Sequence, residues 1–231
     1  MLLELGGSAP VLVQPDTDLE AAADRIVVGG YAYAGQVCIS VQRVLVHQDA
    51  HDRLRQALAR RVEGGVAWGD PREEATISGP MIRKEEADRV EAWVAEALGQ
   101  GARVVAGGGR VGERLLRPVL LEDVDPALPL YRREVFGPAM ILDPYRDLDE
   151  GIAKANDGPW GLQAGLFTRD VGSIFRCFRE IEVGGLIHDD VPTFRVDHMP
   201  YGGVKASGLG REGLRYAIAE LTEPRLLALR P

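Results

Sequence analysis

Cys38 is the residue of this sequence with the clearest potential for chemistry. It lies in the segment YAGQVCIS (33–40), a glycine-containing turn between a helix-like stretch and a strand-like one. Such a turn can hold a thiol at a cleft and aim backbone N–H groups at it, and a thiolate there is a strong nucleophile. The local residues alone leave three interpretations open: packing, a structural thiol and a nucleophile. Cys177, which is flanked by aromatic residues in a helix-like segment, is instead predicted to be buried and unreactive.

Two other patterns with chemical potential point to ordinary structure. His47 and His51 are four residues apart, but no cysteine or carboxylate completes a ligand set at metal spacing, so we predict no metal site. Residues 107–112 fit the pattern G-x-G-x-x-G, but a strand-like segment follows where a phosphate loop needs a helix. A hairpin turn is therefore the better prediction for these glycines. A hydrolase pairing of Cys38 with one of the four histidines stays open, because such pairs meet only in space.

The composition excludes several classes of protein. The chain has 231 residues, a formal net charge of −8 and a pI near 5.1, which argues against nucleic acid as a partner. Two cysteines are too few for a disulfide-built domain, and no signal peptide is evident. The longest uncharged run, residues 26–42, is interrupted by glycines and is too short to span a membrane. We therefore expect a protein of the reducing cytoplasm without membrane contact.

Strand-like and helix-like segments alternate along the chain, which predicts an α/β fold with a mostly parallel sheet and helices on both faces. The segment 115–121 contains Pro118 and is predicted to be an edge strand. Residues 1–7 begin inside an apparent strand, so we expect a domain cut from something longer. The predicted helices are 19–27, 50–62, 82–98, 147–156, 170–181 and 212–221, and the other predicted strands are 41–46, 103–105, 139–142, 163–168, 184–188 and 225–229.

Four motifs in sequence order carry a resemblance to a known family. They are LELGG (3–7), GQVCIS (35–40), REVFGP (133–138) and MPYGGVKASGLGREG (199–213). Together they resemble the aldehyde dehydrogenase superfamily. The resemblance covers essentially the whole chain, but only the C-terminal, catalytic half of the family's length. The closing motif is similar to branches that act on small hydroxy-aldehydes, phospho-aldehydes and semialdehydes.

The resemblance implies a reaction and assigns residues to it. The reaction is the NAD- or NADP-dependent oxidation of an aldehyde to a carboxylic acid through a thiohemiacetal and a thioester on Cys38. Glu4 matches the general base that activates water for thioester hydrolysis. Glu134 matches the carboxylate that holds the nicotinamide ribose, while Phe136 and Leu5 match cofactor-binding positions. The fold it implies is that of an aldehyde dehydrogenase catalytic domain.

The resemblance also implies an organisation, and this sequence departs from it. Residues 1–210 correspond to the catalytic domain and residues 211–231 to a C-terminal helix and oligomerisation strand, so we expect a homo-oligomer acting on a small aldehyde. The N-terminal dinucleotide-binding domain is absent, so we expect incomplete cofactor binding unless a separate chain supplies that domain. Asp189 stands where relatives usually carry asparagine. A carboxylate lacks the amide's donors, so order in the loop near Cys38 is in question.

Two alternatives to a working dehydrogenase follow from the missing half. One is a catalytically silent, truncated fragment that folds and oligomerises without turnover. The other is a cofactor-independent cysteine esterase that uses Cys38 and Glu4.

Overall fold

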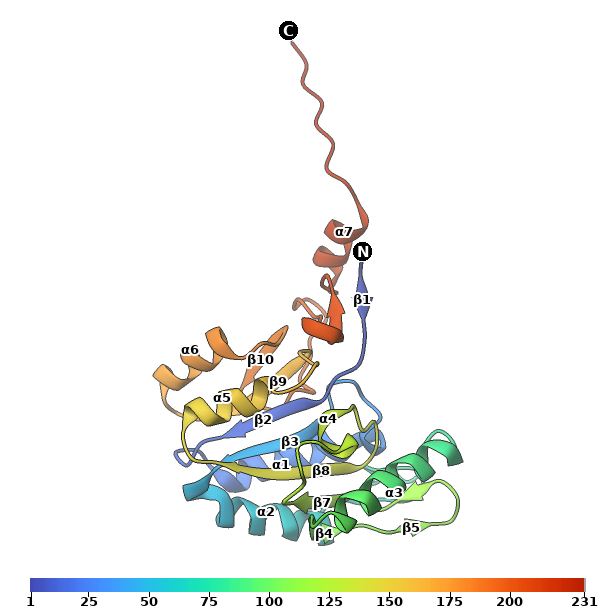
Figure 1. Cartoon of the computed structure of the whole chain (residues 1–231). Helices are drawn as coiled ribbons and strands as arrows, with labels where there is room; N and C mark the ends of the chain where they lie inside the picture. The colour runs from blue at the N-terminus through green and yellow to red at the C-terminus, as the bar shows by residue number, and fades with distance from the viewer. Residues whose placement is uncertain (231) are drawn as a thin grey trace.

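A seven-stranded sheet forms the centre of the molecule in the computed structural model, which describes residues 1–230 (Figure 1). The strand order is β10-β9-β2-β3-β8-β7-β4, and every neighbouring pair is parallel except β4 and β7. The predicted fold class, a mostly parallel α/β sheet, is therefore confirmed. The bounds of the strands are Ala9–Val13 (β2), Val41–His47 (β3), Arg103–Gly107 (β4), Val119–Glu122 (β7), Ala139–Tyr145 (β8), Gln163–Phe167 (β9) and Gly185–His188 (β10).

Helices cover both faces of this sheet (Figure 1). Side chains alternate between the faces, as the twofold period of a strand requires. In β2, for example, Val11 and Val13 pack in one cluster with α1 and α2, whereas Leu12 packs in another with α5 and α6. The helices are Leu19–Tyr31 (α1), His51–Gly64 (α2), Lys84–Gly99 (α3), Pro129–Arg132 (α4), Leu148–Asn156 (α5) and Val171–Glu180 (α6).

Aspartate side chains start three of these helices. Asp18 accepts hydrogen bonds from the backbone N–H groups of residues 20 and 21, and Asp147 and Asp170 cap α5 and α6 in the same way. Such caps satisfy N–H groups that have no partner inside the helix. The helices predicted at 19–27, 147–156 and 170–181 therefore begin within one residue of their predicted starts.

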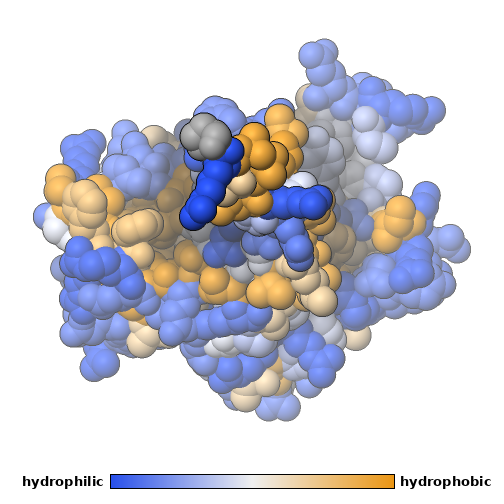
Figure 2. All heavy atoms as spheres, turned by 90° about the horizontal axis from the view of Figure 1, so that it is seen from above, coloured by the Kyte–Doolittle hydropathy of each residue, from blue (hydrophilic) through white to orange (hydrophobic). Residues whose placement is uncertain are grey.

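A narrower projection stands on this body and carries both chain ends (Figure 1). Strand β1 (Leu3–Glu4) pairs with β11 (Gly208–Leu209), and helix α7 (Leu214–Leu221) follows. Beyond α7 the chain is extended, and three of its leucines, at 226, 227 and 229, are exposed. Apolar side chains gather around this tail in the view from above (Figure 2).

Three features of the sheet differ from prediction. The segment 115–121 is not one edge strand: it divides at Pro118 into β6 (Leu115–Leu116), which pairs with β5 (Arg110–Val111), and β7, which lies inside the sheet. Proline has no N–H to donate, so it occupies the junction between the two ladders. Residues 225–229 form no strand among the described residues, because no neighbouring strand pairs with them. Strand β2, which lies between β3 and β9, was not predicted.

Among residues 1–230, no helix combines the length and the apolar character needed to cross a membrane. Nor does this part of the chain contain a group of three or more histidine, cysteine, aspartate or glutamate side chains placed to hold a metal ion.

Candidate active site

The predicted site residues gather at the amino ends of the parallel strands. Cys38 precedes β3, the segment containing Glu4 leads into β2, and Glu134 precedes β8. The loop after β10 returns to the same end, where the Val204 N–H donates to the carbonyl of Gly161 just before β9. Residues far apart in the sequence meet here because parallel strands begin at a common edge of the sheet.

A strained turn delivers Cys38 to this edge. Tyr33 and Ala34 both adopt left-handed backbone conformations, with φ of 55° and 58°, and Gly35 follows at 67°. Non-glycine residues rarely occupy this region, and such strain clusters at functional sites. A side chain at Gly35 would meet the Gly137 carbonyl, so the turn packs closely against the segment that carries Glu134. The Cys38 N–H enters no hydrogen bond within residues 1–230 and is available to an oxyanion.

The thiol of Cys38 contacts a residue to which sequence reasoning assigned no role. The hydroxyl oxygen of Tyr201 lies 3.3 Å from Cys38 Sγ and 3.5 Å from Oε1 of Glu4. Tyr201 is only 3% exposed and packs with Ile39 and Leu162. Its signal was the motif MPYGG, which was identified without a role for the tyrosine. The hydroxyl therefore joins the predicted nucleophile to the predicted base.

The surroundings of Cys38 disfavour its charged form. The surroundings together raise the pKa of the thiol to about 11: burial contributes most, the hydrogen bond from Tyr201 opposes it, and the carboxylates of Glu4 and Glu134 add to it. Burial removes water from a thiolate, and nearby negative charge repels it. The Tyr201 contact is thus the stabilising interaction in a setting that otherwise keeps the thiol protonated.

The two glycines of LELGG, Gly6 and Gly7, allow this segment to pack closely against Cys38 and Glu134. The Gly7 N–H donates to Glu134 Oε1 at 2.9 Å, and a Cβ on Gly7 would lie 2.3 Å from the Cys38 carbonyl oxygen. A Cβ on Gly6 would lie 2.6 Å from Glu134 Oε2. Both distances are shorter than real Cβ contacts. At Gly7 the opposing atom is backbone, so only glycine fits there, whereas a side chain at Gly6 would displace the carboxylate of Glu134.

Gln42 holds the segment that carries Glu134. The side-chain amide of Gln42, in β3, donates to the Arg133 carbonyl at 2.7 Å and accepts from the Val135 N–H at 3.0 Å. These two bonds lie on either side of Glu134; the glutamine and its bond to Val135 are buried, and its bond to Arg133 is partly buried. Burial raises the pKa of Glu134, while the Gly7 N–H lowers it. Gln42 is a second residue that the motifs did not reveal.

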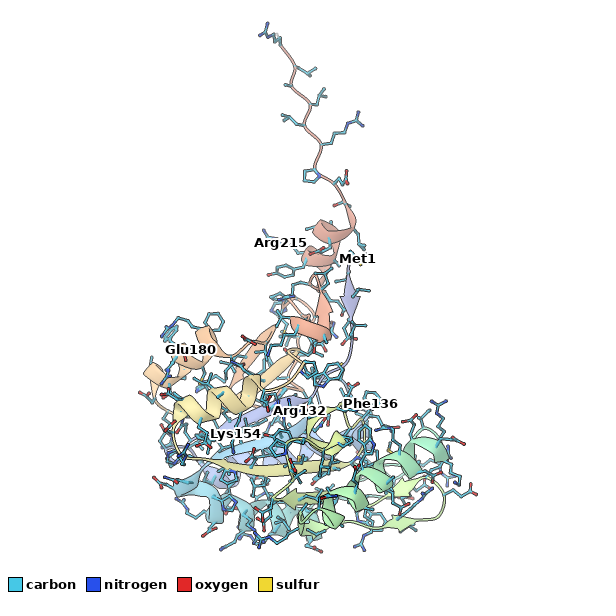
Figure 3. All side chains as sticks on the ribbon, viewed as in Figure 1. Met1, Arg132, Phe136, Lys154, Glu180 and Arg215 are labelled. Atoms are coloured by element: carbon cyan, nitrogen blue, oxygen red, sulfur yellow. The ribbon has the colours of Figure 1, made fainter. Side chains whose placement is uncertain are left out.

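Phe136 and Leu5, the remaining predicted site residues, are partly exposed. Phe136 is 39% exposed, has a φ of 46°, and shares an open hollow with Glu134, Trp93 and Trp160. It lies at the end of the body from which β1 and α7 project (Figure 3). Leu5 is half exposed on the chain between Glu4 and Gly6, and its N–H donates to the carbonyl of Ser207 at 3.1 Å. Their cofactor contacts stay predictions.

Asp189 takes a left-handed conformation at the end of β10, with a φ of 56°. Aspartate and asparagine both tolerate this region. The Asp189 N–H donates to the Leu166 carbonyl at 2.8 Å, and the neighbouring Asp190 forms a two-bond ion pair with Arg25 of α1. These bonds anchor the start of the loop, and the predicted effect of the carboxylate on loop order near Cys38 stays a prediction.

A thiol, a phenol and two carboxylates therefore lie together at one end of a mostly parallel sheet. Comparison with known proteins identifies the class. The profile of the aldehyde dehydrogenase family matches residues 1–227, and this chain belongs to that family.

Relatives and solved structures agree with this assignment. A 3-sulfolactaldehyde dehydrogenase of Priestia aryabhattai is 49% identical over 227 residues, which are 98% of this chain and 47% of that protein. Aldehyde dehydrogenase 21 of Physcomitrella patens, solved with its reaction product succinate, has a TM-score of 0.95 and 39% identity, covering 99% of this chain and 47% of its own. The glyceraldehyde-3-phosphate dehydrogenase of Methanocaldococcus jannaschii, complexed with NADP, has a TM-score of 0.90 and 37% identity, with coverage of 95% and 47%. The chain spans about half the length of the relatives it matches.

Proposed function

We propose that this chain is the catalytic half of an NAD- or NADP-dependent aldehyde dehydrogenase, with Cys38 as the nucleophile and Glu4 as the general base. The contact of one hydroxyl, that of Tyr201, with both Cys38 and Glu4 is the observation that carries the proposal. This contact supports the proposal because it brings the side chains of Cys38 and Glu4 near one hydroxyl although 33 other residues separate them in the sequence. Membership of the family supports aldehyde oxidation over the esterase and the silent fragment.

The Cys38 thiolate adds to the aldehyde carbon and forms a thiohemiacetal. Its sulfur is soft and polarisable, so it adds readily to the carbonyl and later leaves well from a thioester. The negative charge that develops on the substrate oxygen needs a fixed donor, and the Cys38 N–H is available for it. Bound NAD or NADP, held at its nicotinamide end by Glu134 and Phe136, would supply the acceptor for the hydride that the reacting carbon gives up. Cys38 then carries the acyl group as a thioester.

Glu4 completes the reaction by removing a proton from water as the water attacks the thioester. Attack forms the new carbon–oxygen bond and breaks the carbon–sulfur bond, so the carboxylic acid leaves and the Cys38 sulfur is freed. Glu4 is exposed to solvent, so it can return the proton to bulk water.

The residues present fit the nicotinamide end of the cofactor. Oε2 of Glu134 takes part in no hydrogen bond within residues 1–230, so it can accept from ribose hydroxyls. Phe136 adds an exposed aromatic face to the same hollow, and Leu5 is partly exposed on the chain leading to Gly6. We propose these three as cofactor-binding residues.

The proposed organisation assigns residues 1–210 to the catalytic domain and 211–231 to the helix and strand that join subunits. The exposed leucines beyond α7 support an oligomer, because an isolated segment of this kind has unsatisfied backbone groups and apolar side chains. The dinucleotide-binding half would come from an extension of the chain or from a separate one.

A small aldehyde that carries an anionic group is the substrate class we propose. The guanidinium of Arg195 lies 4.2 Å from the centre of the Tyr201 ring, and so next to the aromatic residue that contacts the nucleophile. It pairs with Glu212 at 3.0 Å, but a guanidinium has five N–H donors and can also hold an anion. The relatives named for sulfolactaldehyde and glyceraldehyde 3-phosphate support the same class.

The experiment measures NAD(P)H formation from anionic aldehydes. The chain would be tested alone and fused behind the dinucleotide-binding half of the Priestia relative, each with and without Cys38→Ala. We expect the fusion to form NAD(P)H and Cys38→Ala to abolish it. Product formation that survives Cys38→Ala, or a folded fusion that forms none with either cofactor, would contradict the proposal. Release of nitrophenol from an activated ester without cofactor would instead identify an esterase.

A further inference from the structure

The hydroxyl of Tyr201 has one proton and two acceptors within reach. Cys38 Sγ lies at 3.3 Å, an ordinary hydrogen-bond distance for sulfur, whereas Glu4 Oε1 lies at 3.5 Å, at the outer limit for oxygen. The tyrosine is almost fully buried, so water competes little for the hydroxyl. The distances therefore favour the contact with sulfur, in which the hydroxyl is the donor once the thiol has ionised.

The ring of Tyr201 is held in place without help from its hydroxyl. Its backbone exchanges two hydrogen bonds with Glu212, and the guanidinium of Arg195 lies over the ring while also pairing with Glu212. Ile39 and Leu162 pack in the same apolar cluster as the ring. Removing the hydroxyl alone should therefore leave the ring where it is, so the hydroxyl and the ring can be tested separately.

We propose that Tyr201 is the hydrogen-bond donor that stabilises the Cys38 thiolate, and that the carboxylate of Glu4 competes for the same hydroxyl. This inference rests on the proposed function for its catalytic meaning. When the sulfur attacks the aldehyde, its charge passes to the substrate oxygen and the hydrogen bond to sulfur weakens. The hydroxyl can then donate to Glu4 instead, so the same donor forms a hydrogen bond first with the nucleophile and afterwards with the base.

The charged groups around both residues act in the direction this proposal needs. Glu4 and Glu134 raise the pKa of the Cys38 thiol, in addition to burial, and Tyr201 lowers it. Burial raises the pKa of Tyr201 itself, with smaller contributions from Cys38 and Glu4, and Arg195 opposes them. The phenol therefore keeps its proton and remains a donor while the thiol ionises.

The test is the pH dependence of Cys38 alkylation by iodoacetamide, followed for the Cys38 peptide by mass spectrometry. It uses the 231-residue chain and needs neither cofactor nor aldehyde. Tyr201→Phe should shift the alkylation profile upward by about one pH unit, because a hydrogen bond to a charged group is lost. At a fixed pH below the midpoint the rate should fall by about threefold, since the tenfold loss of thiolate is partly offset by its higher nucleophilicity.

Glu4→Gln is the matched variant with the opposite expectation. It removes a negative charge and replaces the carboxylate by an amide oxygen, which is a weaker acceptor for the hydroxyl, so it should move the profile to lower pH. A Tyr201→Phe chain that reacts at the wild-type rate, or faster at every pH without a shift of midpoint, would overturn the proposal and assign Tyr201 a packing role. Shifts of both variants in the same direction would overturn it as well. Failure of the proposed function has a separate signature, NAD(P)H formation that survives Cys38→Ala.

Discussion

Replacement of Gly7 by alanine tests whether the site depends on the close contact between the LELGG motif and the GQVCIS motif. The new Cβ would lie 2.3 Å from the Cys38 carbonyl oxygen and 3.5 Å from Leu162 Cβ. To restore an ordinary van der Waals distance, the carbonyl must retreat by about 1 Å. The two nearest atoms are the carbonyl oxygen and carbon of Cys38. Because they belong to the backbone, they cannot rotate away as the end of a long side chain could. The turn that carries the thiol must therefore move.

Two magnitudes follow from this displacement. Overpacking of a buried contact costs about 1–3 kcal/mol in the free energy of unfolding. A misplacement of about 1 Å at a reacting group can lower the rate by about 100-fold. The same movement strains the bond from the Gly7 N–H to Glu134, which is 2.9 Å long. We therefore expect Gly7→Ala to lose most Cys38-dependent activity while remaining folded.

Urea unfolding and NAD(P)H formation by the fused chain measure the two effects. Gly64→Ala is the matched control, because a Cβ there meets nothing within 4 Å and the residue ends α2. It should be neutral or slightly stabilising, since alanine loses less backbone entropy than glycine in a helix. A Gly7→Ala chain with wild-type stability and wild-type activity would refute the reasoning, because the predicted collision would then be relieved without moving Cys38.

Three further predictions concern stability and the placement of the site. Gln42→Leu should lower the free energy of unfolding, measured in urea, by about 2–3 kcal/mol and should reduce activity. The reason is that the Arg133 carbonyl and the Val135 N–H, on either side of Glu134, lose their partner. Wild-type stability together with wild-type activity would contradict this. Tyr31→Phe should cost about 1–2 kcal/mol in thermal unfolding, since its fully buried hydroxyl donates to a carbonyl of β7 at 3.0 Å. Burial is the main cause that raises the pKa of Cys38 and Cys177 from 9.0 to about 11 in the folded chain. Between these two pH values the unfolded chain has lost the thiol protons and the folded chain still holds them, so the free energy of unfolding should fall as the pH rises from about 9 through 11. Cys177→Ala should make that fall shallower in urea titrations, and an unchanged slope would show that its thiol does not contribute.

Secondary structure was predictable where local patterns have local causes. Helix α5 begins at the cap that Asp147 provides, and β3 contains three valines and a leucine. Strand β2, APVLV, was missed although all its residues are buried. Its proline is tolerated inside the sheet at a register shift between Ala9 and Pro10. A register shift depends on the partner strand, so no local signal announces it.

The edge assignments failed for a related reason. Whether a strand lies inside a sheet or at its edge depends on its neighbours. Pro118 lies between β6, which belongs to a separate two-stranded sheet, and β7, which lies inside the seven-stranded sheet. Residues 225–229 were predicted to be a strand, but hydrogen bonding to a second strand is what makes one, and none of the described strands pairs with them. Composition describes a preference, and pairing requires a partner in space.

The sequence by itself determined the class of this protein and the identity of its central thiol. The spacing of four motifs pointed to the family, and that comparison singled out Cys38, Glu4 and Glu134. Only the tertiary structure decided how these residues are held: by Tyr201 between the thiol and Glu4, and by Gln42 on both sides of Glu134. The physical reason is that motifs record which residues occur, whereas hydrogen bonds and close contacts depend on where the parallel strands begin in space.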